Sequence, residues 1–214
     1  MSTPFGDITK LILMELKDSQ LVLINKEIAK EYMSDLIITA GTVDFDICVK
    51  DLNQYTPYTE WHKTANINLD VTTYSTILTT PPPTNAKIYV YINDIEIDSS
   101  YYTYNSTTKQ VTVNKSISAN SVIDVGWSFE GEFLVDLTHK EKYIVALCAY
   151  KMYLQQFIKS EDLLRVQIGD KDYKMSSNWQ TLNTLLSLDE RVYQRISELK
   201  YKYLYDNTVV EDYE

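Results

Sequence analysis

The sequence predicts an α+β fold in which a helical core is interrupted by an antiparallel β insertion. Hydrophobic residues recur at helical spacing before residue 42, alternate with polar residues over much of the middle of the chain, and return to helical spacing after residue 132. We therefore expect residues 1–41 and 132–205 to form one helical domain and residues 42–131 a β-rich insertion domain. Residues 206–214 are expected to form a mobile acidic tail.

Two helices are expected before residue 42. Thr3-Pro4 fits a cap with proline in the first turn, and the helix after it has an apolar face of Ile8, Leu11, Ile12 and Leu16. A second helix is expected over residues 26–40, ending at Gly41, with apolar positions four residues apart at Ile28, Tyr32, Leu36 and Ala40. The run at residues 21–24 fits a helix or a strand equally well.

The insertion is expected to consist of short antiparallel strands. Alternating polarity predicts strands over residues 43–49 and 67–71, whereas the three prolines at 81–83 mark a linker or a sheet edge. A hairpin with Asn93-Asp94 as its turn is predicted to join strands at 87–92 and 95–97. Further strands, at 102–104, 110–113 and 122–127, are expected to extend this hairpin into a single meander.

The C-terminal part is expected to form a helical hairpin. Thr138-His139-Lys140-Glu141 is a capping box, and the helix it opens has apolar residues at Tyr143, Leu147, Tyr150, Leu154 and Phe157. A second capping box, Ser177-Asn178-Trp179-Gln180, precedes a long stripe of Leu182, Leu185, Leu188, Val192, Ile196, Leu199 and Tyr203. Between the two helices, residues 165–174 are predicted to be extended with one turn.

Charge and composition exclude some classes of function. The 214 residues include 20 Lys and Arg against 30 Asp and Glu, a net charge of −10, which disfavours binding to the phosphates of DNA. The 18 tyrosines suit half-buried interfaces, although a compositional bias explains them equally well. We find neither a secretion leader nor an apolar run of about 18 residues, so no membrane contact is expected.

No motif for catalysis, cofactor binding or metal binding is present, so we predict that the chain is not an enzyme and takes no cofactor. His62 and His139 are far apart and have no ligand-spaced neighbours, and Cys48 and Cys148 fit two small buried side chains in a reducing compartment. The pairs Asp44/Asp46 and Glu96/Asp98 have the residue types of a carboxylate-dependent hydrolase, but this alternation is more typical of the solvated face of a strand.

Residues 138–200 resemble the C-terminal half of the head–tail connector, or adaptor, proteins of tailed bacteriophages. The resemblance lies in Ala146-Leu147-Cys148-Ala149-Tyr150, the segment 165–177 and the Leu-rich helix 179–199. Residues 87–127 are similar to a β unit of phage virion proteins. The order of the two in one chain strengthens the resemblance to connectors. In composition and layout the chain is most similar to the neck ring proteins of crAss-like phages, although the β insertion is larger than in the simplest connectors.

This resemblance implies a structural virion protein of the phage neck, assembled in the host cytoplasm. It would form a ring, commonly twelve-fold, that joins the portal protein to the tail or to further neck proteins and lets DNA pass through an acidic lumen. It further implies subunit contacts at Val166, Ile168, Asp170, Tyr173 and Trp179, and tail or fibre docking at Tyr89, Tyr91, Tyr102 and Tyr104. The alternatives are a carbohydrate- or receptor-binding accessory module of a virion and a small hydrolase.

Overall fold

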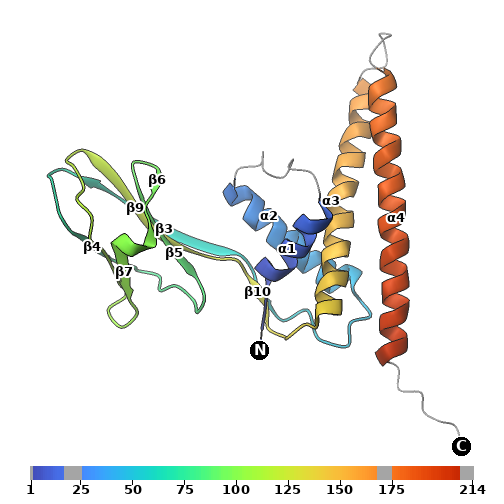
Figure 1. The fold of residues 1–214 in the computed structure, drawn as a ribbon, viewed down its shortest axis with the longest axis horizontal. Helices are drawn as coiled ribbons and strands as arrows, with labels where there is room; N and C mark the ends of the chain where they lie inside the picture. Colours follow the sequence, from blue (N-terminus) through green and yellow to red (C-terminus); the bar gives the residue numbers. More distant parts are fainter. Residues whose placement is uncertain (1, 17–25, 168–174, 208–214) are drawn as a thin grey trace, which may run out of the picture. The chain divides into compact units, whose positions relative to one another are not determined.

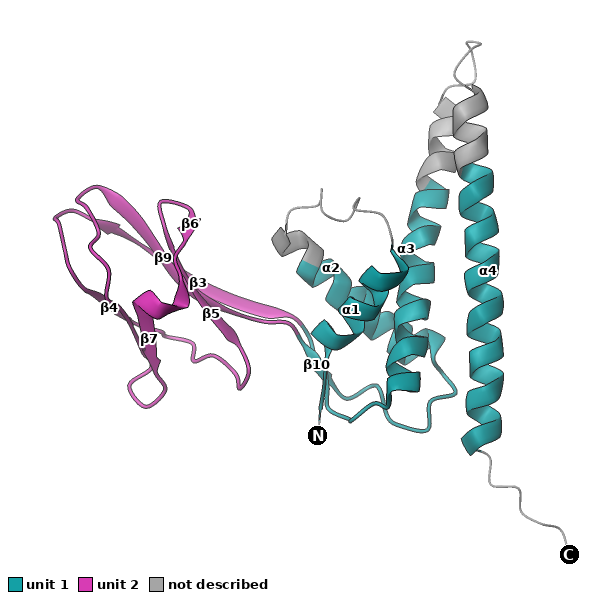
Figure 2. Ribbon diagram, viewed as in Figure 1, with its two compact units in different colours: residues 1–57, 131–214 teal, residues 58–130 magenta. Residues whose placement is uncertain are grey.

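The structure, a computed structural model, describes residues 2–16, 26–167 and 175–207, without the side chains of 26–29, 160–167 and 175–181. It confirms the α+β class, with helices and antiparallel sheets (Figure 1). The chain divides into a helical unit, residues 1–57 with 131–214, and a β unit, residues 58–130 (Figure 2). The first boundary of the β unit thus lies at residue 58, whereas the insertion was predicted to begin at residue 42.

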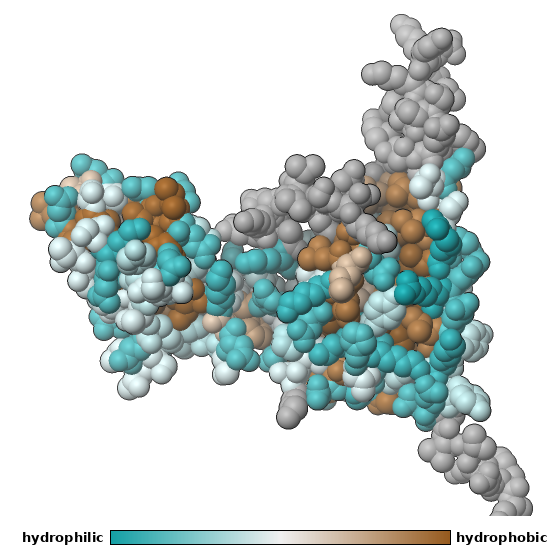
Figure 3. All heavy atoms as spheres, in the orientation of Figure 1, coloured by the Kyte–Doolittle hydropathy of each residue, from teal (hydrophilic) through white to brown (hydrophobic). Residues whose placement is uncertain are grey.

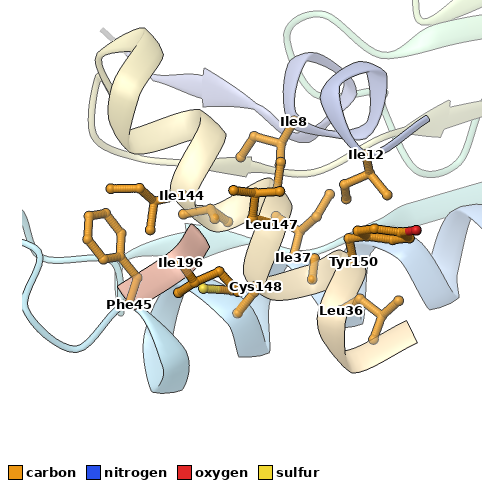
Figure 4. Close-up of a cluster of buried hydrophobic side chains, with 14 of the residues drawn as sticks. Ile8, Ile12, Leu36, Ile37, Phe45, Ile144, Leu147, Cys148, Tyr150 and Ile196 are labelled. Carbon is orange, nitrogen blue, oxygen red and sulfur yellow. The ribbon is translucent and has the colours of Figure 1, made fainter. Parts of the chain in front are cut away.

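The helical unit is built around α3 (His139–Gln167). Helices α1 (Phe5–Glu15), α2 (Lys26–Thr39) and α4 (Met175–Asn207) all contact it. Every residue from Ile144 to Tyr150 is therefore buried, although the apolar stripe of this helix predicted burial on one face. Figure 4 shows the resulting core, in which Ile8 and Ile12 of α1, Ile37 of α2 and Ile196 of α4 surround the Leu147 region of α3.

The helical unit also contains a small three-stranded sheet. Its strand order is β1 (Thr3–Pro4), β10 (Glu132–Phe133) and β2 (Tyr55–Thr56). The prediction that Thr3 caps the first helix is wrong. Thr3 is in β1, its hydroxyl donates to the Val135 carbonyl at 2.9 Å, and it accepts the Leu137 N–H at 2.7 Å. Pro4 occupies the cap position without a side-chain hydrogen bond, because the proline ring has no hydrogen-bonding group, and Thr3 instead holds the segment before α3.

The predicted strand at residues 43–49 is wrong. The chain continues beyond α2 as a π-helical turn, Ala40–Asp44, and then folds back without forming a strand. Phe45 is buried in the helical core, whereas Val43 and Val49 are exposed, so the alternating pattern does not correspond to one sheet face. Gly41 is not a helix terminus either. It lies inside this turn, where a Cβ would stand 2.6 Å from the Phe133 ring.

The connection between α3 and α4 differs from its prediction in the part that the structure describes. Residues 165–167 are the last turn of α3 and not an extended segment. The helix continues this far because residues 139–168 contain no Gly or Pro that would stop it. Helix α4 begins at Met175, so Ser177 lies inside it and does not cap it. Residues 168–174, the run at 21–24 and most of the predicted tail lie outside the described residues.

The β unit contains two antiparallel sheets that share one apolar core. One has the order β3 (Thr59–Ile67), β9 (Ser121–Phe129), β5 (Lys87–Ile92) and β6 (Ile95–Glu96). The other has the order β4 (Tyr74–Ile77), β8 (Gln110–Val113) and β7 (Tyr102–Asn105). The predicted hairpin turn at Asn93-Asp94 is confirmed, since both residues have the positive φ angles, 50° and 64°, that such a turn requires.

The single meander is wrong, because β9 pairs between β3 and β5 instead of following β8. Its core face carries Ile123, Val125, Trp127 and Phe129, and such an apolar strand is best buried in the middle of a sheet. The strand predicted at 67–71 is also wrong. Residue 67 ends β3, Leu69 is 76% exposed, and Val71 forms an isolated bridge with Ile117. Strand β4 was not predicted.

Candidate interaction surface

Helix α4 has two apolar faces, and α3 covers one of them. The predicted stripe of Leu182, Leu185, Leu188, Val192, Ile196, Leu199 and Tyr203 is buried or half-buried in the helical unit. A second set, which we call the outer stripe, is exposed: Leu186 (47%), Tyr193 (52%), Tyr201 (75%) and Leu204 (41%). At 3.6 residues per turn, positions 186, 193 and 204 fall within about 20° of one line along the helix, and position 201 about 60° from it.

Exposed hydrophobic side chains that form one continuous patch often mark a contact with another molecule, whereas single scattered ones do not. Hydrophobic side chains also reach the surface at other places on the face drawn in Figure 3. The outer stripe differs from them in running for about five turns along one helix. It was not predicted, because its residues are 7, 8 and 3 positions apart and lack the regular spacing of three and four that marks a helical stripe.

The charges of α4 balance, in contrast with those of the chain as a whole. The helix has four acidic and four basic residues and is therefore neutral, in a chain whose net charge is −10: Asp189, Glu190, Glu198 and Asp206 against Arg191, Arg195, Lys200 and Lys202. Two copies of so acidic a chain repel each other at most orientations. A contact through the neutral α4 adds little to this repulsion.

Ion pairs and rings hold α4 on the rest of the helical unit. Arg195 pairs with Glu15 of α1 at 3.5 Å and lies over the Tyr143 ring, while the Tyr143 hydroxyl donates to Glu15 at 2.8 Å. Burial, together with the hydrogen bond to Glu15, raises the pKa of Tyr143 to about 12. Lys200 donates to the Asp44 carbonyl and pairs with the Asp46 carboxylate at 3.2 Å. These contacts fix which flank of α4 faces outward.

The strongest tie is a buried polar cluster around Glu141, which is 2% exposed. Its capping box with Thr138 is confirmed: the Glu141 carboxylate accepts the Thr138 N–H at 2.7 Å, and the Glu141 N–H donates in return to the Thr138 hydroxyl at 3.3 Å. The same carboxylate accepts the Lys50 ammonium at 2.6 Å and the Tyr203 hydroxyl at 2.9 Å. Glu141 therefore joins the start of α3 to the loop after α2 and to the end of α4.

The protonation of this cluster follows from its contacts. Burial by itself raises the pKa of Glu141, but the hydrogen bonds from Lys50, Thr138 and Tyr203 outweigh it, so the pKa lies below the ordinary 4.5. Burial also raises the pKa of Tyr203, which stays protonated and accepts the Val49 N–H at 3.3 Å. The carboxylate is thus charged and occupied by donors on both oxygens, an arrangement that suits a structural fastening.

A surface pocket of about 290 Å³ lies in the loop after α2, with Asp46, Val49 and Asp51 among its lining residues. Cys48 also lines it, 3.8 Å from the Tyr203 hydroxyl, and burial raises the pKa of its thiol. Burial raises the pKa of Cys148 further, to about 12. Both thiols are consequently poor nucleophiles.

The acidic pairs proposed for a hydrolase have other partners in the structure. Asp98 caps the short 3-10 helix Ser99–Tyr101 by accepting the Ser100 N–H at 2.8 Å, and the hydrogen bonds from Ser100 lower its pKa. Glu96 pairs with Lys87 at 3.2 Å. A general acid requires a raised pKa, so Asp98 has the opposite tendency. Within the described ranges no three His, Cys, Asp or Glu side chains are grouped to hold a metal.

The four tyrosines predicted for docking do not share one face of the β unit. Tyr102 and Tyr104 pack against its core, and the Tyr102 hydroxyl donates to the Ile88 carbonyl at 2.8 Å. Tyr89 and Tyr91 alternate with the core residues of β5 and lie on the other face, ring to ring at 5.4 Å. A Cβ at Gly126 would stand 2.7 Å from the Tyr89 ring, so that ring covers the glycine of the neighbouring strand.

The edge strand β3 carries a charge on its core face. Lys63 is directly opposite Val125 of β9, and opposed residues in antiparallel strands point to the same side, yet Lys63 is exposed. An inward-pointing charge on an edge strand hinders the addition of another strand, because pairing would bury the ammonium. The β3 edge is therefore protected against edge-to-edge association.

Lys63→Val is expected to remove this protection and to let the β unit pair with other copies through β3. Turbidity and sedimentation at micromolar concentration should show aggregates in the variant. The control is Thr64→Val, which adds a β-branched apolar residue on the other face of the same strand. Equal solubility of Lys63→Val and Thr64→Val would show that Lys63 has no such role.

The residues predicted for the subunit interface cannot be placed as side chains. Val166 is in α3 and Trp179 in α4, both without described side chains, and Ile168, Asp170 and Tyr173 lie outside the described residues. No helix in the described part of the chain combines the length and the hydrophobicity that crossing a membrane requires. No protein-family model matches the chain, and a search of curated proteins finds no similar sequence.

Proposed function

We propose that this chain is a structural subunit that assembles with copies of itself through the outer stripe of α4. The observation that carries the proposal is an exposed apolar stripe on a neutral helix of a strongly acidic chain. Burying such a stripe against another protein contributes about 25 cal/mol per Å² of apolar surface removed from water, and the neutrality of α4 limits the opposing charge repulsion. A contact between copies is the simplest use of both features.

The further proposal is that the assembly is a ring in the neck of a tailed bacteriophage. It rests on the resemblance of residues 138–200 to head–tail connector proteins, for which twelve subunits are common, and on the hairpin of α3 and α4, which is long enough to form a ring wall. The ring would join the portal protein to the tail or to further neck proteins. Its acidic surface would let DNA pass without tight phosphate contacts.

Electron microscopy of the purified full-length chain tests this proposal. We expect closed rings of constant subunit number with an open centre, and α4 at the contact between neighbouring subunits. A repeated heterologous contact forms a ring when the rotation between subunits closes and a filament when it does not. The proposed ring requires the first case. Isolated single chains, or open filaments of variable length, would contradict the proposed ring.

A further inference from the structure

A ring of identical subunits needs two different surfaces, because each copy presents one face to the neighbour on one side and another face to the neighbour on the other. The outer stripe of α4 supplies one surface. The second must be complementary to α4, and the pocket in the loop after α2 has the properties required. The inference that follows rests on the proposed self-assembly and names the two patches that meet.

The pocket combines an acidic lining with exposed apolar side chains. Val49 lines it and is 66% exposed, and the nearby Val43 is 64% exposed. Residues 41–53 contain three Asp and one Lys, a net charge of −2. The ammonium of Lys50 is directed to Glu141 and the Asp136 carbonyl, both at 2.6 Å, so the pocket keeps its negative character.

The carboxylates in the pocket retain room for a further cation. The Asp46 carboxylate forms an ion pair with the Lys200 ammonium of its own chain at 3.2 Å, but the Asp46 side chain is 69% exposed. Asp51 accepts only the amides of Asn53 and Gln54 among the described residues, at 3.0 and 2.9 Å, and these hydrogen bonds lower its pKa. Both carboxylates are therefore accessible to a donor from outside.

The C-terminal end of α4 carries the complementary groups. Tyr201 is 75% exposed, and the adjacent Lys202 is exposed and forms no ion pair with any residue that the structure describes. Tyr201 and Lys202 are consecutive on the helix, so their side chains point about 100° apart and together cover a wide face of the helix end, one side apolar and the other cationic. The two patches are complementary in hydrophobicity and opposite in charge.

We infer that the pocket of one copy receives Tyr201 and Lys202 of the next copy. Tyr201 packs against Val43 and Val49, and the Lys202 ammonium pairs with Asp46 and Asp51. The pocket and the end of α4 are different patches, so the contact is heterologous when each copy engages two different neighbours, and it then leaves a pocket and a helix end available for the next copies. This is the geometry from which a ring grows.

A charge-swap experiment tests the pairing. Lys202→Glu brings a negative charge to the acidic pocket, and Val49→Lys places a positive charge where Lys202 should enter. Each single change is expected to weaken association at least tenfold in analytical ultracentrifugation. The double variant Lys202→Glu with Val49→Lys is expected to recover most of the lost affinity, because the new carboxylate on α4 and the new ammonium in the pocket attract each other across the contact.

Two controls separate this inference from the proposed function. Lys159→Glu makes the same charge change at an exposed position of α3, and thermal melting verifies that each variant folds. If changes in the outer stripe dissociate the particle while Lys202→Glu and Val49→Lys do not, the proposed self-assembly stands and this docking is wrong. If the single changes weaken association and the double variant does not recover it, the docking is also wrong. If the wild-type chain never associates, both the docking and the proposed self-assembly are wrong.

Discussion

Glu141→Gln is expected to lower the free energy of unfolding of the helical unit by about 3 kcal/mol. The change keeps the shape of the side chain but removes the charge that holds the Lys50 ammonium at 2.6 Å and weakens the bonds from Thr138 and Tyr203. Breaking a buried ion pair from one side costs about 3–5 kcal/mol, and Lys50 is 30% exposed, which places the effect near the lower end.

Urea unfolding monitored by circular dichroism measures this loss. The control is Glu198→Gln, the same change at an exposed position of α4, which should alter stability by less than about 0.5 kcal/mol. Tyr203→Phe should cost about 1–2 kcal/mol, because it leaves the Val49 N–H without the tyrosine oxygen. Equal stability of Glu141→Gln and Glu198→Gln would show that the cluster does not fasten α4.

The same variant has a defined pH dependence. The pKa of Glu141 in the folded chain lies below its ordinary 4.5, so its contribution to stability is present above pH 4.5 and is lost as the pH falls through the folded pKa. The difference in unfolding free energy between wild type and Glu141→Gln should therefore be constant near neutrality and shrink below pH 4.5. A difference that grows on acidification would contradict the assignment.

The double change Leu186→Glu with Tyr193→Glu is expected to weaken self-association by more than about 100-fold. Each change places a charge on the outer stripe, and truncating or charging a central interface residue costs about 2 kcal/mol or more. Sedimentation velocity across a concentration series measures the effect. Melting must be followed as well, because the Lys151 ammonium lies 4.6 Å from the centre of the Tyr193 ring.

The matched control for this double change is Ser187→Glu with Gln194→Glu. It adds the same two charges one residue further along α4, at exposed polar positions about 80–100° from the line of Leu186, Tyr193 and Leu204. If both double variants dissociate equally, net charge and not the outer stripe controls association. If neither does, the copies meet through another surface.

Elements fixed by short-range interactions could be predicted. The capping box at Thr138 and Glu141 and the regular leucines of α4 identify the C-terminal helices, since each signal depends on neighbours within a turn or two. The turn at Asn93-Asp94 was predictable because Asn and Asp tolerate positive φ angles. What the sequence did not reveal is where α4 begins, because no glycine or proline marks the residues just before Met175.

Features set by distant partners could not be predicted. The place of β9 between β3 and β5 depends on competition among strands, and β3 was missed because its core face includes Lys63 and is only partly apolar. Likewise the sequence shows Glu141 as a capping residue, while its burial depends on Lys50 and Tyr203, which are 91 and 62 residues away. The outer stripe was missed for another reason, because its residues are 7, 8 and 3 positions apart and do not form a regular helical pattern.

The mass of the wild-type particle in solution tests the central proposal most directly. Light scattering of the full-length chain should give a mass that is a fixed multiple of one chain and constant across micromolar concentrations. A mass of one chain at every concentration would contradict self-assembly through α4.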